Sequence, residues 1–243
     1  MYNVGINNAI MHEWENRYKG IPLIFDGAVS PSRYWAEPIK VVICLKECVM
    51  YQEDSGSPLE GKTKTIPGDG RFKTSEDSYS ITDYLYENGG LGGSPTWTNE
   101  CRIAELLLEG KNIHKFDEPD GIHRRNIFRR IGHMELSKLG GTPMQSPWYE
   151  KIINDNKDLI GKQLSNFDAN YYVICGKPSW EVVKSVINLE DYKHISVKVE
   201  HNGGNMEFWT CPEKNKTLIL MCHPSDIYRF DKQLAVIKTF IEA

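Results

Sequence analysis

Residues 39–45 read IKVVICL, and this stretch decides the class of fold. Every residue from Val41 onward is apolar, and Lys40 is the only polar residue in the run. A strand with one face in water alternates apolar and polar residues, whereas a strand covered on both faces is continuously apolar. The stretch therefore predicts a buried strand of a parallel sheet with helices on both faces.

Strand-like and helix-like segments alternate along the rest of the chain. Further strands are expected in the segment that ends at Leu136, at residues 171–175 and at residues 217–222. Helices are expected at residues 7–18, at 98–108, from 146 onward, at 178–187 and after 225, with a β-hairpin around residues 202–204. This alternation predicts a three-layer α/β/α fold with a central, mainly parallel four-stranded sheet. We expect one domain, residues 1–243, with an N-terminal helical segment 1–38 and a loop-rich insertion 51–98.

Polar side chains stand where four of the expected strands end. These ends carry Lys46-Glu47, Glu135, Gly176 and His223. Ligands of such sheets bind at the carboxyl ends of the strands. We therefore expect two carboxylates and an imidazole to meet at one edge of the sheet.

The composition excludes several classes of protein. No apolar run approaches the roughly 18 residues that cross a bilayer, and residues 1–14 lack the basic and apolar regions of a secretory signal. We expect a cytoplasmic, monomeric protein without membrane contact. The six cysteines form no CxxC pair, so neither a metal nor another cofactor is expected.

The charge pattern leaves two interpretations open. A net charge of −4 argues mildly against a protein that coats nucleic acid without specificity. Residues 111–130 nevertheless concentrate basic side chains: Lys111, Lys115, Arg124, Arg125, Arg129 and Arg130. This stretch is either a local nucleic-acid footprint or a solvated surface offset by nearby acidic residues.

The first strand end resembles a motif of the uracil-DNA glycosylase superfamily. KECVMYQED, residues 46–54, is similar to GEAPGxxED, the first motif of the thermostable branch. Glu47 falls on the catalytic carboxylate, and Asp54 falls in the trailing acidic pair. Lys46 and Val49-Met50 replace the Gly and Pro-Gly of the family motif.

Later segments resemble further motifs of this superfamily in the same order, so the resemblance covers residues 39–243. HMELSK, residues 133–138, resembles a strand that ends in Asn-x-x-Lys, with Glu135 in place of the Asn that reads uracil. Residues 171–183 resemble the family's strand, Gly turn and helix. CHPSDIYR, residues 222–229, resembles the terminal HPS motif, with His223 on the catalytic histidine. The cluster cysteines of the thermostable branch are missing, so an iron-sulfur cluster is not expected.

The resemblance implies a monofunctional DNA glycosylase that flips a base out of DNA and hydrolyses its N-glycosidic bond. Its implied catalytic residues are Glu47, His223 and Asp54. Its implied base-binding residues are Glu135, Phe72 and Tyr51. Its implied DNA-binding residues are Ser225, Ile227, Tyr228, Arg229, Lys138 and Lys177. In this interpretation a carboxylate orients the attacking water, and a histidine donates a hydrogen bond to the departing base.

Glu135 carries the inference about the substrate. An ionised carboxylate only accepts hydrogen bonds, so it opposes uracil O4 but matches the exocyclic amine of cytosine. We therefore expect a cytosine-type base, modified so that normal cytosine is spared, an activity that suits defence against phages with modified DNA. A misalignment of HMELSK with the family motif would make His133 or Ser137 the reader instead.

Other functions stay open at this stage. A uracil or mispair glycosylase of base-excision repair fits if Glu135 is peripheral. A catalytically inactive DNA-binding or interaction module fits the replaced Gly-Pro-Gly positions. A nucleoside or nucleotide-sugar hydrolase on the same kind of sheet would act without DNA.

Overall fold

The computed structural model describes residues 2–21, 23–45, 79–89, 95–110, 121–139, 147–200 and 203–242. The helices are α1 (Val4–Arg17), α2 (Pro31–Ala36), α3 (Ile81–Asn88), α4 (Pro95–Glu109), α5 (Ile122–Phe128), α6 (Pro147–Asp155), α7 (Lys157–Phe167), α8 (Lys177–Val186) and α9 (Ile227–Glu242). The strands are β1 (Ile24–Phe25), β2 (Gly27–Ala28), β3 (Val41–Leu45), β4 (Tyr79–Ser80), β5 (Gly132–Glu135), β6 (Tyr171–Cys175), β7 (Lys193–Val199), β8 (Gly204–Cys211) and β9 (Lys216–Met221). A short 3₁₀ turn, Pro212–Lys214, joins β8 to β9.

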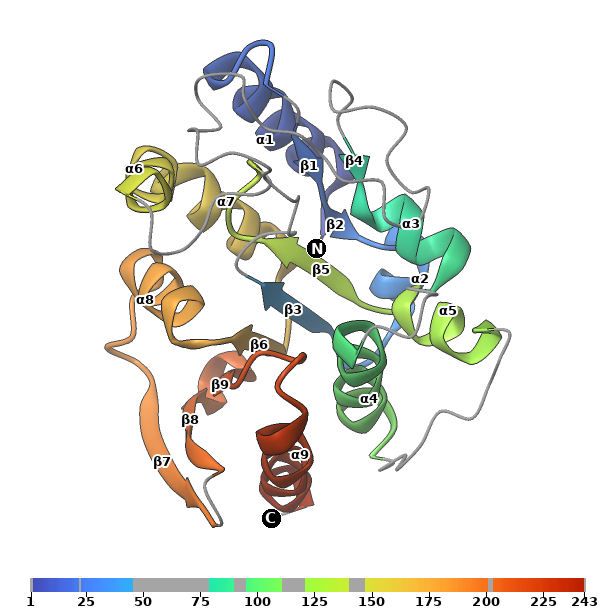
Figure 1. The fold of residues 1–243 in the computed structure, drawn as a ribbon, viewed down its shortest axis with the longest axis vertical. Coiled ribbons are helices and arrows are strands. Elements are labelled where there is room, and N and C mark those ends of the chain that lie inside the picture. Colours follow the sequence, from blue (N-terminus) through green and yellow to red (C-terminus); the bar gives the residue numbers. More distant parts are fainter. Residues whose placement is uncertain are drawn as a thin grey trace.

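A seven-stranded mixed sheet forms the centre of the molecule, in the order β2-β5-β3-β6-β9-β8-β7 (Figure 1). The inner strands β5, β3, β6 and β9 pair in parallel. The β2 edge and the β8–β7 edge pair antiparallel. The α/β class is confirmed, but the predicted four-stranded sheet is too small, because the hairpin and β2 extend the sheet at both edges.

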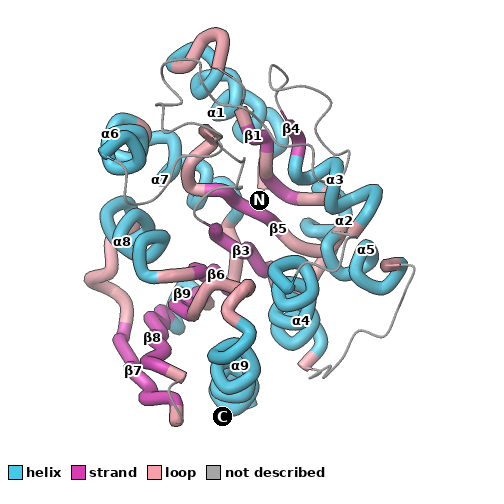
Figure 2. Tube along the Cα trace, viewed as in Figure 1, coloured by secondary structure: helices cyan, strands magenta, loops and turns pink. Residues whose placement is uncertain are grey.

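Helices cover both faces of this sheet (Figures 1 and 2). Alternate residues of β3 point to opposite faces: Val41, Ile43 and Leu45 belong to one hydrophobic cluster, and Val42 and Cys44 belong to another. The first cluster includes buried residues of α3, α4, α5 and α9, and the second includes residues of α1, α6, α7 and α8. This division explains why the strand is wholly apolar: neither of its faces reaches water.

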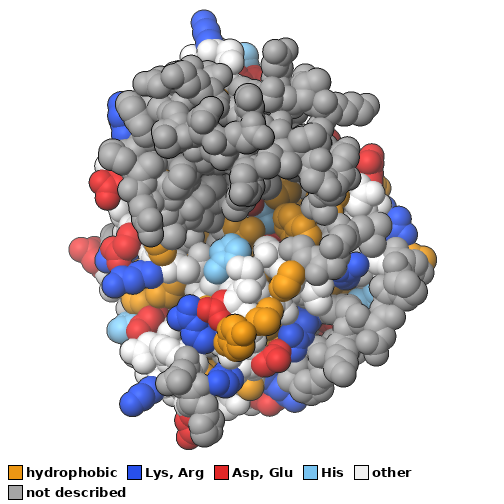
Figure 3. All heavy atoms as spheres, in the orientation of Figure 1, with side chains coloured by type: hydrophobic (Ala, Val, Ile, Leu, Met, Phe, Trp, Pro, Cys, Tyr) orange, Lys and Arg blue, Asp and Glu red, His pale blue; other side chains and the backbone are white. Residues whose placement is uncertain are grey.

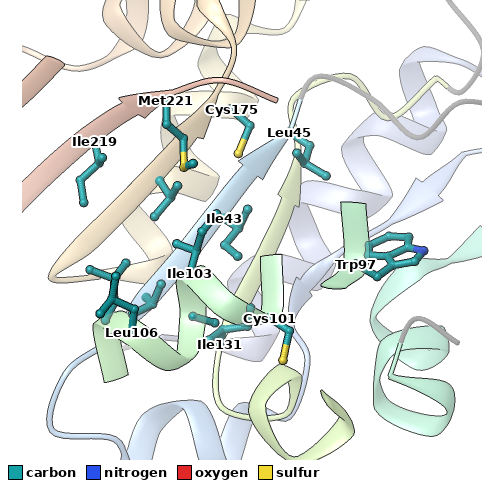
Figure 4. Close-up of a cluster of buried hydrophobic side chains, with 14 of the residues drawn as sticks. Ile43, Leu45, Trp97, Cys101, Ile103, Leu106, Ile131, Cys175, Ile219 and Met221 are labelled. Carbon is teal, nitrogen blue, oxygen red and sulfur yellow. The ribbon is translucent and has the colours of Figure 1, made fainter. Parts of the chain in front are cut away.

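The interface between the sheet and α4 forms much of the first cluster. Figure 4 shows Ile43, Cys175 and Met221 from three adjacent parallel strands beside Ile103 and Leu106 of α4. All five side chains are 2% exposed or less. The tight packing fixes the position of α4 relative to the carboxyl ends of the strands, which matters because polar side chains of α4 also point toward the sheet.

The structure adds detail to two local expectations about helices. Within residues 51–98, predicted to be mostly loop, the described residues 79–89 and 95–98 include α3, with the Ser80 side chain accepting a hydrogen bond from the Asp83 N–H as its N-cap. Its buried Ile81, Tyr84 and Leu85 have helical spacing over only two turns. The single helix expected from residue 146 is two helices, α6 and α7, with the wholly buried Asn156 between them.

Candidate functional site

The order of the parallel strands places a topological switch point between β3 and β6. After β3 the chain continues to α4 on one face of the sheet, whereas after β6 it continues to α8 on the opposite face. Adjacent parallel strands whose connections leave in opposite directions define the usual ligand position of an open α/β sheet. The chain segments that follow β5 and β9 flank this position.

The loop after β9 carries an exposed histidine in a defined orientation. The backbone N–H of Ser225 donates to His223 Nδ1 at 3.2 Å, and Ser225 Oγ lies 2.7 Å from the same atom. Because Nδ1 accepts the backbone hydrogen bond, the neutral imidazole carries its proton on Nε2. His223 therefore has the tautomer of a hydrogen-bond donor through Nε2.

Two buried amides, which the sequence did not identify, anchor this loop. The Asn99 side chain of α4 donates to the Pro224 carbonyl at 2.6 Å, and the Cys222 N–H donates to the Gln233 side chain at 2.7 Å. Asn99 is far from residues 223–225 in the sequence, and Gln233 lies within an ordinary helical pattern. Only the fold therefore reveals their role. They hold the histidine loop between α4 and α9.

Large apolar side chains project from the start of α9. Ile227 is 56% exposed and Tyr228 is 83% exposed, which is unusual for residues of this size. Figure 3 shows hydrophobic, basic and histidine side chains together over the segment between β9 and α9. Arg229 lies next to them and its Nε donates to Asp226 at 2.6 Å. This surface therefore combines exposed apolar side chains with charged ones.

A cleft of about 710 Å³ joins several of the residues singled out in the sequence. Lys177, His223 and Arg229 all line it, together with residues of the β7–β8 hairpin. The opposite wall includes Trp209, which stacks between Trp180 (ring centroids 4.0 Å apart) and His194 (4.4 Å). The cleft extends the candidate site from the end of β9 toward the hairpin.

Glu135 lies at the carboxyl end of β5, beside Leu45 of β3, and is 1% exposed. Its Oε1 lies 3.0 Å from His133 Nε2. His133 Nδ1 in turn lies 3.3 Å from Oε2 of Glu100 on α4, so the imidazole sits between two carboxyl groups. Among the described residues, Glu135 Oε2 has no hydrogen-bond partner.

This arrangement sets the charge of His133. Burial by itself lowers the pKa of His133, but the hydrogen bonds and charges of Glu100 and Glu135 outweigh burial and raise the pKa to about 10. His133 is therefore an imidazolium near neutral pH. Burial raises the pKa of Glu100, and its contact with His133 partly offsets that rise.

The pH dependence of stability tests this charge assignment. Because the pKa of His133 rises from 6.5 to about 10 on folding, its stabilisation is complete below pH 6.5, declines above it and is lost above about pH 10. We expect the difference in Tm between the wild type and His133→Gln to shrink as pH rises through this window. Thermal melts at several pH values measure it, with His123→Gln as the control; a constant difference would contradict the assignment.

Lys138, expected to contact DNA, is instead wholly buried. Its Nζ donates to Asp26 Oδ2 and to the Glu135 carbonyl oxygen. Asp26 Oδ2 also accepts from the Glu135 N–H at 2.5 Å, and Asp26 Oδ1 accepts from Gln163 at 2.7 Å. A buried ammonium needs an anion and further acceptors, and Lys138 finds them in Asp26 and the Glu135 carbonyl oxygen. These contacts fix the end of β5.

The arginines of the basic stretch mostly bind protein groups. Arg129 donates to the Tyr86 carbonyl oxygen and lies 4.1 Å from the centre of its ring. Arg130 pairs with Glu37 at 2.7 Å, and Arg125 donates to a carbonyl of α3 at 3.1 Å. Among the described residues of this stretch, these contacts join α5 to its neighbours and give little support to a phosphate-binding track.

Four of the expected site residues, Glu47, Tyr51, Asp54 and Phe72, lie outside the described residues. The remaining ones form two groups on the same edge of the sheet: Glu135 at β5, and the His223 loop with Lys177 at β9 and β6. Strands lie about 4.8 Å apart, so three strand steps separate the ends of β5 and β9 by about 14 Å. The switch point between β3 and β6 lies between the two groups in the strand order.

Comparison with family models, with curated proteins and with solved structures finds no match. Within the described ranges, no group of three or more His, Cys, Asp or Glu side chains is arranged to hold a metal ion. No helix in the described part of the chain is long and apolar enough to cross a membrane. The fold and the site define an α/β protein with polar side chains at the carboxyl edge of its parallel strands.

Proposed function

We propose that this protein is a monofunctional DNA glycosylase that excises a modified, cytosine-type base from DNA. The observation that carries the proposal is Glu135, a buried carboxylate with one oxygen unpartnered among the described residues, at the end of a central strand. A buried acceptor without a partner is costly unless a ligand supplies the donor. The exocyclic amine of cytosine is such a donor.

The His223 loop supplies the second part of the proposed site. A departing base gains negative charge as its N-glycosidic bond breaks, and a preorganised donor stabilises that charge. The N–H on Nε2 of His223 would fill this role, because Ser225 holds Nδ1 as an acceptor. Glu47 lies two residues after the end of β3 in the sequence. It would orient the water that attacks the sugar.

Exposed side chains beside His223 suit the extrusion of a base. A flipped base leaves a gap in the duplex, and apolar wedges commonly fill such gaps. Ile227 and Tyr228 have the exposure that a wedge requires. Lys177, also exposed, and Arg229 lie at the same cleft and would contact the phosphates.

A base-release assay tests the proposal. Duplexes containing uracil, 5-methylcytosine, 5-hydroxymethylcytosine or glucosylated 5-hydroxymethylcytosine are incubated with the protein, and the free base and abasic sites are measured. We expect release of at least one modified cytosine, and His223→Ala to slow it by about 10²- to 10³-fold through loss of the donor. His12→Ala, which changes a 72% exposed side chain on α1, is the matched control.

The same assay separates the competing functions. Release of uracil alone would favour a repair glycosylase, and activity on free nucleosides would favour a nucleoside hydrolase. Binding of the duplexes without release of any base would contradict the glycosylase proposal and favour a binding module. Trapping with borohydride detects a covalent lyase intermediate, which a monofunctional glycosylase does not form.

A further inference from the structure

The Glu100–His133–Glu135 triad joins α4 to the end of β5 in a wholly buried position. The exposed fractions of the three side chains are 0%, 0% and 1%. His133 Nε2 lies 3.0 Å from Glu135 Oε1, and His133 Nδ1 lies 3.3 Å from Glu100 Oε2. Both ring nitrogens thus lie within ion-pair distance of a carboxyl oxygen, and among the described residues the contact of Nε2 with Glu135 has hydrogen-bond geometry, whereas Nδ1 and the Glu100 oxygens have no hydrogen-bond partner.

The backbone of Glu135 is fixed from the opposite direction. Its N–H donates to Asp26, and its carbonyl oxygen accepts from the ammonium group of Lys138. Gln163 holds the other oxygen of Asp26 at 2.7 Å. The Glu135 backbone and its Oε1 therefore both have fixed partners, and its Oε2 is the atom left without one among the described residues.

We propose that His133 and Glu100 are positioning residues that hold Glu135 as an oriented anion, so that its Oε2 selects bases with an exocyclic amine over bases with a carbonyl. This inference rests on the proposed function and specifies how its substrate class is recognised. A protonated Glu135 could donate to a base carbonyl and would lose the selection. His133 Nε2 lies 3.0 Å from Oε1, so the ring can donate to that oxygen and leave Oε2 to face the base as an acceptor.

The burial of the triad makes the selection strong. Glu135 is 1% exposed, so a bound base that lacks the matching donor would leave its Oε2 without a partner. A site built around a fixed buried acceptor rejects ligands that lack the matching donor far better than an apolar pocket rejects a change of size. Trp97 also packs near the imidazole, with ring centroids 5.9 Å apart, and limits movement of His133.

A matched pair of substrates tests this inference. 5-Hydroxymethylcytosine carries an exocyclic amine where 5-hydroxymethyluracil carries a carbonyl. The kcat and KM for base release are measured on duplexes that contain either base. We expect the wild type to favour the amine base at least about tenfold in kcat/KM, and His133→Gln to lower that ratio about tenfold. Glu100→Gln should lower it less, because Glu135 keeps its contact with His133.

His123→Gln is the matched control, because His123 also pairs with a buried glutamate, Glu105, at 3.0 Å. A purely structural role for the triad predicts reduced stability and equal loss on both bases, with an unchanged ratio. An unchanged ratio in His133→Gln, or a wild type that prefers the uracil base, would overturn the inference while leaving glycosylase activity established. Absence of base release from every duplex would instead remove the proposed function and the inference with it.

A second measurement keeps the inference testable if His133→Gln does not fold. The ¹⁵N chemical shifts of the His133 ring in the wild type distinguish an imidazolium from a neutral imidazole. We expect both ring nitrogens to be protonated at about pH 8, where an ordinary histidine is neutral. A neutral ring at this pH would overturn the inference.

Discussion

Replacing Glu135 with glutamine should change the preferred base of the protein from a cytosine type to a uracil type. The amide presents a donor as well as an acceptor, so it can bond to uracil O4 where the carboxylate opposes it. We expect kcat/KM on the 5-hydroxymethylcytosine duplex to fall by about 10- to 100-fold, which is the scale of one good base contact. We expect kcat/KM on the 5-hydroxymethyluracil duplex to rise. Base-release kinetics on both duplexes measure the change.

Glu105→Gln is a close control for this substitution. Glu105 is also 1% exposed, belongs to α4 and lies 3.0 Å from a histidine ring, but it contacts His123 rather than the strand end. We expect this variant to keep the wild-type order of preference. If both variants lost activity equally on the two duplexes, Glu135 would be a structural residue and not the base reader.

The central strands could be predicted because their environment is uniform. β3 and β6 are covered on both faces, so their sequences are apolar runs that need no knowledge of the partner strands. The antiparallel strands at the edges of the sheet were harder to predict. The β7–β8 hairpin was expected from residues 202–204, but its pairing with β9 depends on contacts that local pattern does not encode.

The candidate site was predicted unevenly for a similar reason. The position of His223 at a strand end follows from a local motif, and the structure indeed gives it an exposed place beside Ser225. The pairing of His133 with Glu100 joins two elements, and no spacing in the sequence indicates it. Lys138 was assigned to DNA contact because the motif resemblance implied it, whereas burial with Asp26 makes it part of the scaffold.

Substituting glutamine for Glu47 should abolish base release while DNA binding persists. Under the proposed function, Glu47 orients the water that attacks the sugar, and the amide cannot act as the general base. We expect the rate of base release to fall by about 10²- to 10⁴-fold, with the dissociation constant for a duplex changed little. Single-turnover release and fluorescence anisotropy measure the two quantities separately.

Two further variants make this result specific. Asp54→Asn tests the second acidic candidate and should cost less than Glu47→Gln, because Asp54 lies nine residues after the end of β3 in the sequence and Glu47 only two. Glu60→Gln, in the same stretch but outside the motif, should leave release unchanged. A Glu47→Gln protein that still releases base at the wild-type rate would exclude Glu47 from the chemistry, and a larger loss in Asp54→Asn would transfer the role to Asp54.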